Sequence, residues 1–529
     1  MLPRDLIKRC ARNYPNKTAY YMGEHSATWR RMDERSDWLA AGLQKLGIGK
    51  GDAIGVLSQE SIEIYEQFMA CMKIGAVRVG INWRYASEEV LHCARDSGIR
   101  ALVVQGRLVE QLKNELERFA DAGVLVIGYD DGHGLDLDYE AIIDQGRQRA
   151  VDYPALDRDD TLFVTYTSGT SGLPKGVVLS HGGLHDVILH SVLSVGLGPD
   201  DVWYMPAASS WVVIAMNVWG LANGMAHVIP EGAFDVKAYL RDVERHRVTV
   251  VMQVPTTLRW LMREFATGQY DFSSVRLLVF GSSPASPELI HQIHGTWPDV
   301  GLLQTYGQTE VTGGWVTFMT PADYRLAFDG RPELLKSVGR VGLHFELTVR
   351  DDEGKELPPG ETGELWMRGT PMMKGYQNLP EKTREVMPGD GWLRSHDIVS
   401  IDADGYVYLH DRKNFLIITG AVNVFPSSVE AVVMTHSAVE EVAVIGVPHP
   451  EWGEAVVAVV KPKDGESLAA DELIDFCRSH LSKPETPKHV LIVDHPLPKT
   501  LTAKLQKAEI RRWVLDDPKR LPWSVAEAK

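Results

Sequence analysis

Cysteine is scarce in this chain of 529 residues, which contains only Cys10, Cys71, Cys93 and Cys477. No two of them have the Cys-x-x-Cys spacing typical of zinc ribbons and redox centres, and four scattered thiols do not make a disulfide framework. Proteins that depend on disulfides belong to oxidising compartments. The sequence therefore favours a reducing compartment, and we expect a cytoplasmic protein.

Positive charge is also in short supply, because 55 Lys and Arg residues stand against 71 Asp and Glu, a net charge of −16. Proteins that bind nucleic acids neutralise phosphates with clustered Lys and Arg, so we expect no nucleic-acid partner. Hydrophobic residues make up 44% of the chain, as in globular proteins, which excludes wholesale disorder.

Extended apolar stretches are few, and the N-terminus has no apolar core of the kind found in secretory signal peptides. Residues 202–230 carry no Asp, Glu, Lys or Arg. A spanning helix needs about 20 apolar residues, so the length would allow one. Ser209, Ser210 and Asn217 interrupt the run, and we expect no transmembrane segment. The alternatives are a buried helix or the wall of an apolar substrate pocket. The chain also lacks His-Glu-x-x-His and Gly-x-Ser-x-Gly motifs, which argues against zinc and serine hydrolases.

Helix and strand patterns alternate along the first hundred residues. Periodic apolar positions predict helices, and short apolar runs predict buried parallel strands. The predicted helices cover residues 29–46, 62–74 and 88–95, and the predicted strands cover 53–57, 77–81 and 101–104. Strict alternation is typical of an α/β architecture with a largely parallel sheet.

The C-terminal part has a different pattern. Glycines separate short β-rich runs in residues 339–370, which indicates a small β unit. Strands are predicted at 440–447 and 455–460, and a helix at 470–479. The sequence thus predicts an α/β fold: a large N-terminal domain (1–410) of parallel-sheet α/β subdomains plus the small β unit, and a small α+β C-terminal domain (411–529).

The most informative segment is a Gly-, Ser- and Thr-rich turn that follows the apolar strand 162–167 directly and ends in Pro174-Lys175-Gly176. Glycines let the backbone approach a phosphate, hydroxyls add donors and Lys175 adds a positive charge. The turn is neither a Walker A loop nor a dinucleotide-binding fingerprint. A flexible linker, the alternative, seldom follows an apolar strand so closely.

Residues 166–176 resemble the signature loop of the adenylate-forming superfamily, which includes acyl-CoA synthetases, luciferases and peptide-synthetase adenylation domains. Ser171 stands where threonine is usual. Further similar motifs follow in family order up to residue 510. The resemblance implies an ATP/AMP site built from Thr167, Ser168, Gly169, Thr170, Ser171, Gly172, Lys175, Ser282, Ser283, Pro284, Thr305, Tyr306, Gly307, Gln308, Thr309, Asp397 and Arg412.

The resemblance also assigns catalytic roles. Tyr306 would stack on adenine, Thr309 would contact a phosphate, and Glu310 would hold Mg²⁺, which prefers oxygen ligands. Lys504 would stabilise the charge that develops at the α-phosphate.

Asp397 and Arg412, which lie fifteen residues apart, would bind the ribose hydroxyls. A hinge is expected at Asn414, about which the C-terminal domain would rotate between two half-reactions.

Three positions depart from the family pattern. Ser395-His396 precede Asp397 where Thr-Gly is common, and Asn414 stands where Asp or Lys is common. Ala503 replaces a glycine before Lys504, and alanine is strained wherever φ is positive.

The acyl pocket would include Trp211, Val212, Gly281 and Gly307, and Trp211 is more like the acetyl- and medium-chain acyl-CoA synthetase branch. We expect a small or medium apolar acid, although Trp211 and Val212 could equally belong to ordinary core.

The implied reaction joins a small-molecule carboxylic acid to AMP at the expense of ATP, with Mg²⁺, and then forms a thioester with coenzyme A. A carrier-protein phosphopantetheine or another nucleophile is the alternative acceptor. A protein that binds nucleotide or acyl ligand without turnover is the non-enzyme alternative. The sequence does not specify the oligomeric state.

Overall fold

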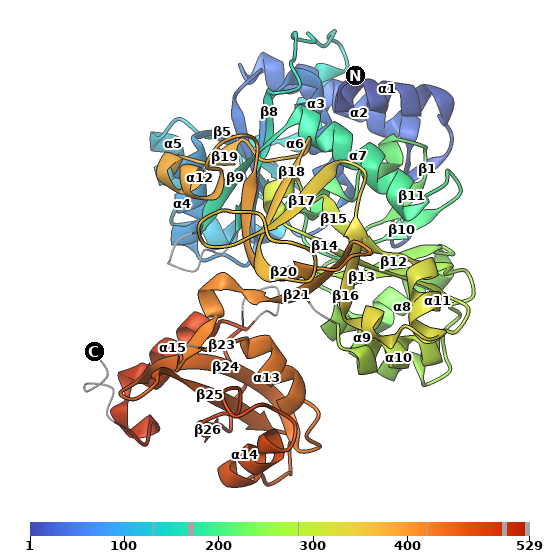
Figure 1. Ribbon diagram of the computed structural model, residues 1–529. Coiled ribbons are helices and arrows are strands. Elements are labelled where there is room, and N and C mark those ends of the chain that lie inside the picture. Colours follow the sequence, from blue (N-terminus) through green and yellow to red (C-terminus); the bar gives the residue numbers. More distant parts are fainter. Residues whose placement is uncertain (131, 168–173, 284, 421, 500–504, 524–529) are drawn as a thin grey trace. The chain divides into compact units, whose positions relative to one another are not determined.

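The computed structural model describes residues 1–130, 132–167, 174–283, 285–420, 422–499 and 505–523. The chain divides into two compact units (Figure 1). Unit 1 comprises Met1–Leu347 and Met367–Leu393, and unit 2 comprises Thr348–Trp366 and Arg394–Lys529. The domain boundary predicted at 410/411 falls inside unit 2 by this division.

The first sheet of unit 1 has the strand order β19-β9-β8-β4-β3-β5-β6-β7. Neighbours from β8 to β7 pair in parallel, whereas β9 and β19 pair antiparallel. The strands are β3 (Ala53–Leu57), β4 (Val77–Ile81), β5 (Ile99–Gln105), β6 (Leu125–Tyr129), β7 (Leu137–Asp138), β8 (Thr161–Thr167), β9 (Lys175–Ser180) and β19 (Gly375–Tyr376). The strands predicted at 53–57 and 77–81 are confirmed with the same bounds.

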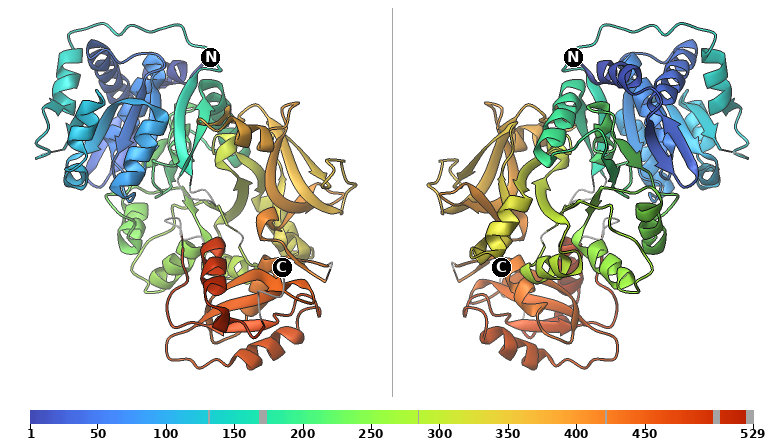
Figure 2. Two further views of the ribbon diagram at one scale, coloured as in Figure 1. Left: turned by 90° about the vertical axis from the view of Figure 1, so that its left-hand side faces the viewer. Right: turned by 90° about the vertical axis from the view of Figure 1, so that its right-hand side faces the viewer.

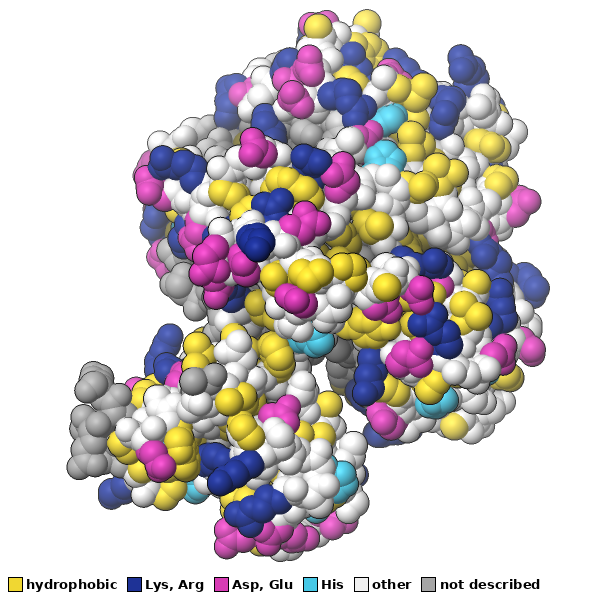
Figure 3. Space-filling view, viewed as in Figure 1, with side chains coloured by type: hydrophobic (Ala, Val, Ile, Leu, Met, Phe, Trp, Pro, Cys, Tyr) yellow, Lys and Arg dark blue, Asp and Glu magenta, His cyan; other side chains and the backbone are white. Residues whose placement is uncertain are grey.

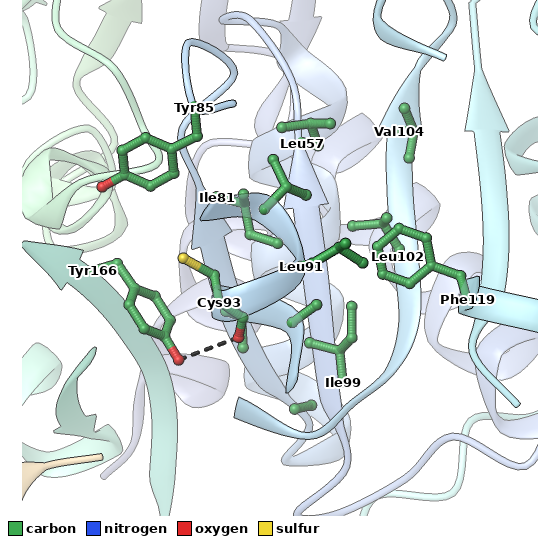
Figure 4. Packing of buried hydrophobic residues seen from close by; sticks show 14 of the residues in the cluster. Leu57, Ile81, Tyr85, Leu91, Cys93, Ile99, Leu102, Val104, Phe119 and Tyr166 are labelled. Carbon is green, nitrogen blue, oxygen red and sulfur yellow. Dashed lines mark hydrogen bonds between the residues drawn. The ribbon is translucent and has the colours of Figure 1, made fainter. Parts of the chain in front are cut away.

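Helices cover both faces of this sheet (Figure 2). Leu102 and Val104 of β5 pack on one face with α4 and α5, and Figure 4 shows this cluster around Leu91 and Phe119. Ala101 and Val103 pack on the other face with α2, α3 and α6. A strand buried on both faces reads as a continuous apolar run, which is why it was predictable. The helices are α2 (Trp29–Lys45), α3 (Ile62–Ile74), α4 (Ser87–Ser97), α5 (Leu116–Asp121) and α6 (Tyr139–Gly146).

A second sheet in unit 1 runs β16-β15-β14-β13-β12-β10-β11-β1-β2. It is parallel from β14 to β1 and antiparallel at both ends. The strands are β1 (Thr18–Met22), β2 (His25–Thr28), β10 (Val202–Tyr204), β11 (Ala226–Val228), β12 (Val250–Gln253), β13 (Leu277–Gly281), β14 (Gly301–Gly307), β15 (Trp315–Met319) and β16 (Ser337–Val341). The remaining helices of this unit are α1 (Pro3–Asn13), α7 (His181–Val195), α8 (Val236–Arg245), α9 (Pro255–Phe265), α10 (Pro287–Thr296), α11 (Pro321–Phe328) and α12 (Pro380–Val386).

The charge-free run 202–230 forms β10, two short 3-10 turns (Val212–Ala215 and Trp219–Leu221) and β11. Most of its side chains are buried within unit 1. Across the described ranges, no helix combines the length and apolarity that a membrane crossing requires.

Four neighbouring strands, β17 (Phe345–Arg350), β18 (Thr362–Gly369), β20 (Leu393–Ile401) and β21 (Tyr406–Arg412), include the segments where the chain passes between the units. Unit 2 also holds a sheet ordered β23-β22-β25-β24, with β26 parallel to β25. Its elements are β22 (Ile417–Thr419), β23 (Val422–Val424), α13 (Pro426–Val433), β24 (Val439–His449), β25 (Gly453–Pro462), α14 (Ala470–Arg478), β26 (His489–Ile492) and α15 (Lys507–Asp516). The predicted fold class is confirmed.

Surface charge is mixed rather than segregated on the face that Figure 3 shows. Lys and Arg side chains lie among Asp and Glu there and do not gather into a basic stripe.

Candidate functional site

The site residues of unit 1 follow the carboxyl ends of neighbouring strands. β13 ends at Gly281 and β14 at Gly307, and Gly281 is in register with Thr305. Loops at the carboxyl ends of parallel strands are where open α/β sheets bind ligands. The structure thus brings together two predicted segments, Ser282-Ser283 and 308–310.

Both strand-end glycines accept a close backbone approach. A Cβ on Gly281 would lie 2.5 Å from the carbonyl oxygen of Thr305, and one on Gly307 would lie 2.3 Å from that of Gly314. Ser282 adopts a left-handed φ of +67°, which turns the chain sharply after β13. Any side chain at either glycine would push these loops apart.

Tyr306 and Glu310 are placed by hydrogen bonds. Tyr306 is buried, and its hydroxyl accepts a hydrogen bond from Gln308 Nε2 at 3.1 Å. Thr309 and Glu310 are half-buried in a 3-10 turn. The Tyr376 hydroxyl donates to Glu310 Oε1 at 2.9 Å, and the Met373 N–H donates to the Glu310 carbonyl oxygen at 2.7 Å.

Lys175 lies over the ring of the same tyrosine. Its Nζ is 4.8 Å from the centroid of the Tyr376 ring, a cation–π contact. Burial and then the charge of Lys382 lower the pKa of Lys175, while Glu310 opposes them. Tyr376 therefore bridges the predicted phosphate lysine and the predicted magnesium carboxylate. Sequence reasoning missed Tyr376, because it is brought to this site by the pairing of β19 with β9, which the sequence does not reveal.

Glu310 suits Mg²⁺ held jointly with a nucleotide. Mg²⁺ in such sites is bound by one or two carboxylates plus phosphates and keeps several waters. Among the residues that the structure describes, there is no cluster of three or more His, Cys, Asp or Glu side chains that could hold a metal by itself. A single carboxylate at the end of β14 fits the shared arrangement.

The residues predicted to form the wall of the acyl pocket contact the turn that follows Glu310. Trp211 and Val212 are half-buried. Gly313 has a φ of +66°, and a Cβ there would lie 2.7 Å from Val212 Cγ2. Thr312, also left-handed, donates from its hydroxyl to the Pro371 carbonyl oxygen at 2.7 Å. Val212 thus packs on the turn that follows Glu310.

In unit 2 the predicted ribose pair is brought together. Asp397 on β20 is in register with Arg412 on β21, and Arg412 Nε lies 2.6 Å from Asp397 Oδ1. The Asp397 side chain is 3% exposed and that of Arg412 is 51% exposed, so the guanidinium covers a buried carboxylate. The predicted hinge Asn414 lies in the turn Lys413–Phe415 directly after β21.

The unusual His396 has a structural explanation. Its φ is +58°, a left-handed conformation that glycine adopts freely and other residues adopt at a cost of about 1–2 kcal/mol. His396 Nδ1 lies 3.2 Å from Glu364 Oε1. The imidazole thus lies beside a carboxylate, a contact that a glycine at this position could not make.

Glu364 is a buried carboxylate with three basic neighbours. Besides His396, Arg394 lies 2.8 Å and Lys413 3.2 Å from Glu364 Oε2. Burial raises the pKa of Glu364, but the hydrogen bonds from His396 and Arg394 and the nearby charges outweigh it and lower the pKa to about 2. The partners of Glu364 are sequence neighbours of the predicted ribose pair and of the predicted hinge, since His396 precedes Asp397 and Lys413 precedes Asn414. Sequence reasoning missed Glu364, because nothing local marks a residue thirty positions away from its partner.

Some predicted residues lie outside the described residues: 168–172 of the phosphate loop, Pro284, and Ala503-Lys504. Thr167 ends β8, next to the start of that loop.

Comparison with known proteins supplies an independent view of the whole chain. Residues 7–377 match the family model described as AMP-binding enzyme, and residues 428–504 match that of the AMP-binding enzyme C-terminal domain. An indoleacetate–CoA ligase of Aromatoleum aromaticum is 30% identical, covering 96% of this chain and 97% of the relative. A feruloyl-CoA synthase of an Amycolatopsis species is 32% identical, covering 95% and 97%. Among solved structures, the amide bond synthetase McbA from Marinactinospora thermotolerans has a TM-score of 0.85 at 29% identity, covering 97% of this chain and 100% of that one.

Proposed function

This chain belongs to the family of AMP-binding enzymes, and we propose that it activates an apolar carboxylic acid with ATP and passes the acyl group to the thiol of coenzyme A. The superfamily predicted from the sequence is confirmed, and so is the class of AMP-forming acid–thiol ligase, since its relatives over nearly the full length are named CoA ligases and synthetases. The observation that carries the proposal is the Lys175–Tyr376–Glu310 arrangement at the end of β14.

In the first half-reaction a carboxylate oxygen attacks the α-phosphorus of ATP, the bond to the bridging oxygen breaks, and pyrophosphate leaves. The loop 167–172 with Lys175 would hold phosphates, and Thr309 would contact one of them. Tyr306 would stack on adenine. Glu310 would hold Mg²⁺, which neutralises phosphate charge when bound.

The residues of unit 2 would complete this step. Asp397 and Arg412 would bind the ribose hydroxyls. Lys504 would stabilise negative charge at the α-phosphate in the transition state. A carboxylate accepts hydrogen bonds from a diol, and the half-exposed Arg412 guanidinium that covers Asp397 would have to move aside to let the ribose reach it.

In the second half-reaction the thiolate attacks the carbonyl carbon of the acyl-adenylate, and AMP leaves with the former carboxylate oxygen. Rotation of residues 411–529 about Asn414 would remove Lys504 and admit the thiol. The position of Asn414 in a short turn, directly after the strand that holds Arg412, supports a hinge there.

The acid would bind against Trp211 and Val212, with Gly281 and Gly307 leaving room for the carboxylate end. The charge-free run that supplies this wall favours an apolar acyl group of small or medium size. The two relatives named above are called indoleacetate and feruloyl enzymes, so aromatic acids belong in the same test.

A second candidate differs only in the acceptor. McbA, which resembles this chain over its whole length, is named an amide bond synthetase, and an amine attacks an acyl-adenylate as a thiol does. A carrier-protein phosphopantetheine is a third acceptor with the same thiol as coenzyme A.

The experiment measures pyrophosphate and AMP release from ATP over a panel of aliphatic and aromatic acids, each with coenzyme A, with an amine, and with neither. The proposal expects one group of acids to give AMP release that depends on coenzyme A, with the thioester identified by mass spectrometry. If the amine stimulates AMP release and coenzyme A does not, the protein is assigned to the second candidate function. Absence of pyrophosphate with every acid contradicts acid activation.

A further inference from the structure

We propose that Glu60 is a positioning residue that fixes the acyl-binding segment 209–217 and thereby helps to set acid selectivity. The inference rests on the proposed function, since it assigns a support to the wall formed by Trp211 and Val212. Glu60 lies in the loop between β3 and α3, about 150 residues away in sequence from the segment that it holds.

Glu60 holds the first end of the segment directly. The backbone N–H of Ser209 donates to Glu60 Oε1 at 2.5 Å, and the carboxylate is only 8% exposed. A hydrogen bond is electrostatically stronger where water is excluded. This contact fixes the backbone two residues before Trp211.

The same carboxylate reaches the other end of the segment through Tyr65. The Tyr65 hydroxyl donates to Glu60 Oε2 at 3.0 Å and accepts from Asn217 Nδ2 at 3.0 Å. Asn217 is fully buried, and its Oδ1 accepts from Trp203 Nε1 at 3.1 Å. Both ends of the acyl-binding segment are thus tied to one carboxylate.

Arg78 is a buried basic side chain that interacts electrostatically with Glu60. Its side chain, on β4, is 1% exposed, and Nε and Nη1 have no hydrogen-bond partner among the described residues. Burial raises the pKa of Glu60, and the Arg78 charge opposes that effect. A buried cation without a carboxylate nearby would be costly.

The segment 209–217 also contacts the turn that carries the candidate nucleotide-site residues Thr309 and Glu310. Between its two fixed ends the segment places Val212 against Gly313, on the turn that begins with Thr309 and Glu310. Displacement of the segment would therefore alter mainly the wall that meets the acyl group, because the hydrogen bonds to Tyr306 and Glu310 come from Gln308, Tyr376 and Met373, which lie outside the segment. This separates the role of Glu60 from that of a residue needed only for folding.

The test compares Glu60→Ala with Glu63→Ala, which removes a half-buried acidic side chain from the same end of α3. KM values for the acid and for ATP are measured separately in the full-length protein, with short and long acids. We expect Glu60→Ala to raise the KM for the acid about ten-fold or more and to change the ratio of kcat/KM between short and long acids. The KM for ATP should stay within about two-fold. Glu63→Ala should leave both profiles as they are. Glu60→Gln keeps an acceptor oxygen for Ser209 but no negative charge for Arg78, so it should restore only part of the selectivity.

Hydrogen exchange supplies a readout that does not depend on catalysis. Glu60→Ala should speed exchange of the amides in 209–217 and leave β3 and β5 unchanged. If Glu60→Ala does not fold, Tyr65→Phe carries the test, because it removes the bridging hydroxyl and keeps the ring.

Two results overturn the inference: an unchanged acid profile with unchanged exchange in 209–217, or KM values for acid and ATP that rise by the same factor. If the wild-type protein activates no acid, the proposed function fails, and the exchange result alone then decides whether Glu60 fixes the segment.

Discussion

The two units hold their candidate binding residues by different means. In unit 1 these residues follow β13 and β14, and strand register and apolar packing set their positions. In unit 2 Asp397 and Arg412 lie on antiparallel strands, and charges fix them: one ion pair between them, and a second group around Glu364. Under the proposed function, unit 1 would select the acid through apolar packing, and unit 2 would supply ionic contacts that can form again after the proposed rotation.

The largest expected difference between variants of the two units is at Lys504, in unit 2. Lys504→Ala should slow adenylate formation by roughly 10²–10³-fold, because a charge that meets the transition state is lost. Thioester formation from a supplied acyl-adenylate should be largely intact. Rapid-quench measurement of each half-reaction checks this.

Lys499→Ala is the control, since its ammonium is paired with Glu441. Equal loss of both half-reactions in Lys504→Ala would contradict a role confined to the first step.

Two variants test the candidate magnesium carboxylate of unit 1, one at Glu310 and one at Tyr376, which donates a hydrogen bond to it. Glu310→Gln should lower kcat/KM for ATP by about a hundred-fold and raise the Mg²⁺ concentration needed for half-maximal rate, because a neutral amide is a poor Mg²⁺ ligand. Tyr376→Phe, which removes only the hydroxyl that donates to Glu310, should cost about ten-fold or less. Magnesium titrations of the initial rate distinguish them, and a larger effect of Tyr376→Phe would show that the tyrosine does more than orient the carboxylate.

The apolar side of unit 1 is tested at Trp211. Trp211→Ala should shift the preference towards longer acids by about ten-fold in the ratio of kcat/KM values, since each methylene in an apolar pocket contributes about 1–3 kcal/mol. Trp260→Ala removes a 46% exposed indole from α9 and should leave that ratio unaltered. Competition between acids of different length in one reaction measures the ratio, and an unaltered profile for Trp211→Ala places the acyl wall elsewhere.

The smallest expected effect is a difference between the units in how their stability depends on pH. Burial lowers the pKa of His227 in unit 1 from 6.5 to about 3, and its Nε2 accepts a hydrogen bond from Gly220 N–H at 3.0 Å. Below pH 6.5 the histidine binds a proton in the unfolded chain but stays neutral in the folded unit. The contribution of neutral His227 to stability is therefore complete above pH 6.5 and is lost as the pH falls towards 3.

Glu364 in unit 2, with its pKa lowered from 4.5 to about 2, contributes stability above pH 4.5 that is lost only as the pH falls from there towards 2. Hydrogen exchange by mass spectrometry between pH 7 and pH 4 should therefore show unit 1 opening first. His227→Gln should flatten the response of unit 1, because glutamine can accept the same hydrogen bond without titrating. Simultaneous loss of protection in both units would contradict the assignment.

Much of the fold could be predicted because its signals are local. The runs 53–57 and 77–81 are apolar on both faces, which only a covered strand tolerates, and the helix over 62–74 ends at Gly75 in a left-handed cap. The site followed from spacing within single segments, as at 305–310. Tyr376, Glu364 and Glu60 could not be found in this way, since each has a hydrogen-bond partner between 30 and 149 positions away in the sequence. At His396 the sequence revealed a departure from the family pattern. The structure then showed that this residue has a left-handed backbone and lies beside Glu364.

The amino-acid sequence by itself determined the alternation of elements and the family, and it predicts a phosphate-binding loop, because period, turn residues and short motifs are properties of neighbouring residues. Only the tertiary structure decided that Asp397 meets Arg412, that Tyr376 bridges Lys175 and Glu310, and that Glu60 braces a segment from another part of the chain. The physical reason is that a buried polar group must find its partner wherever packing places one, and packing is settled by the whole chain at once.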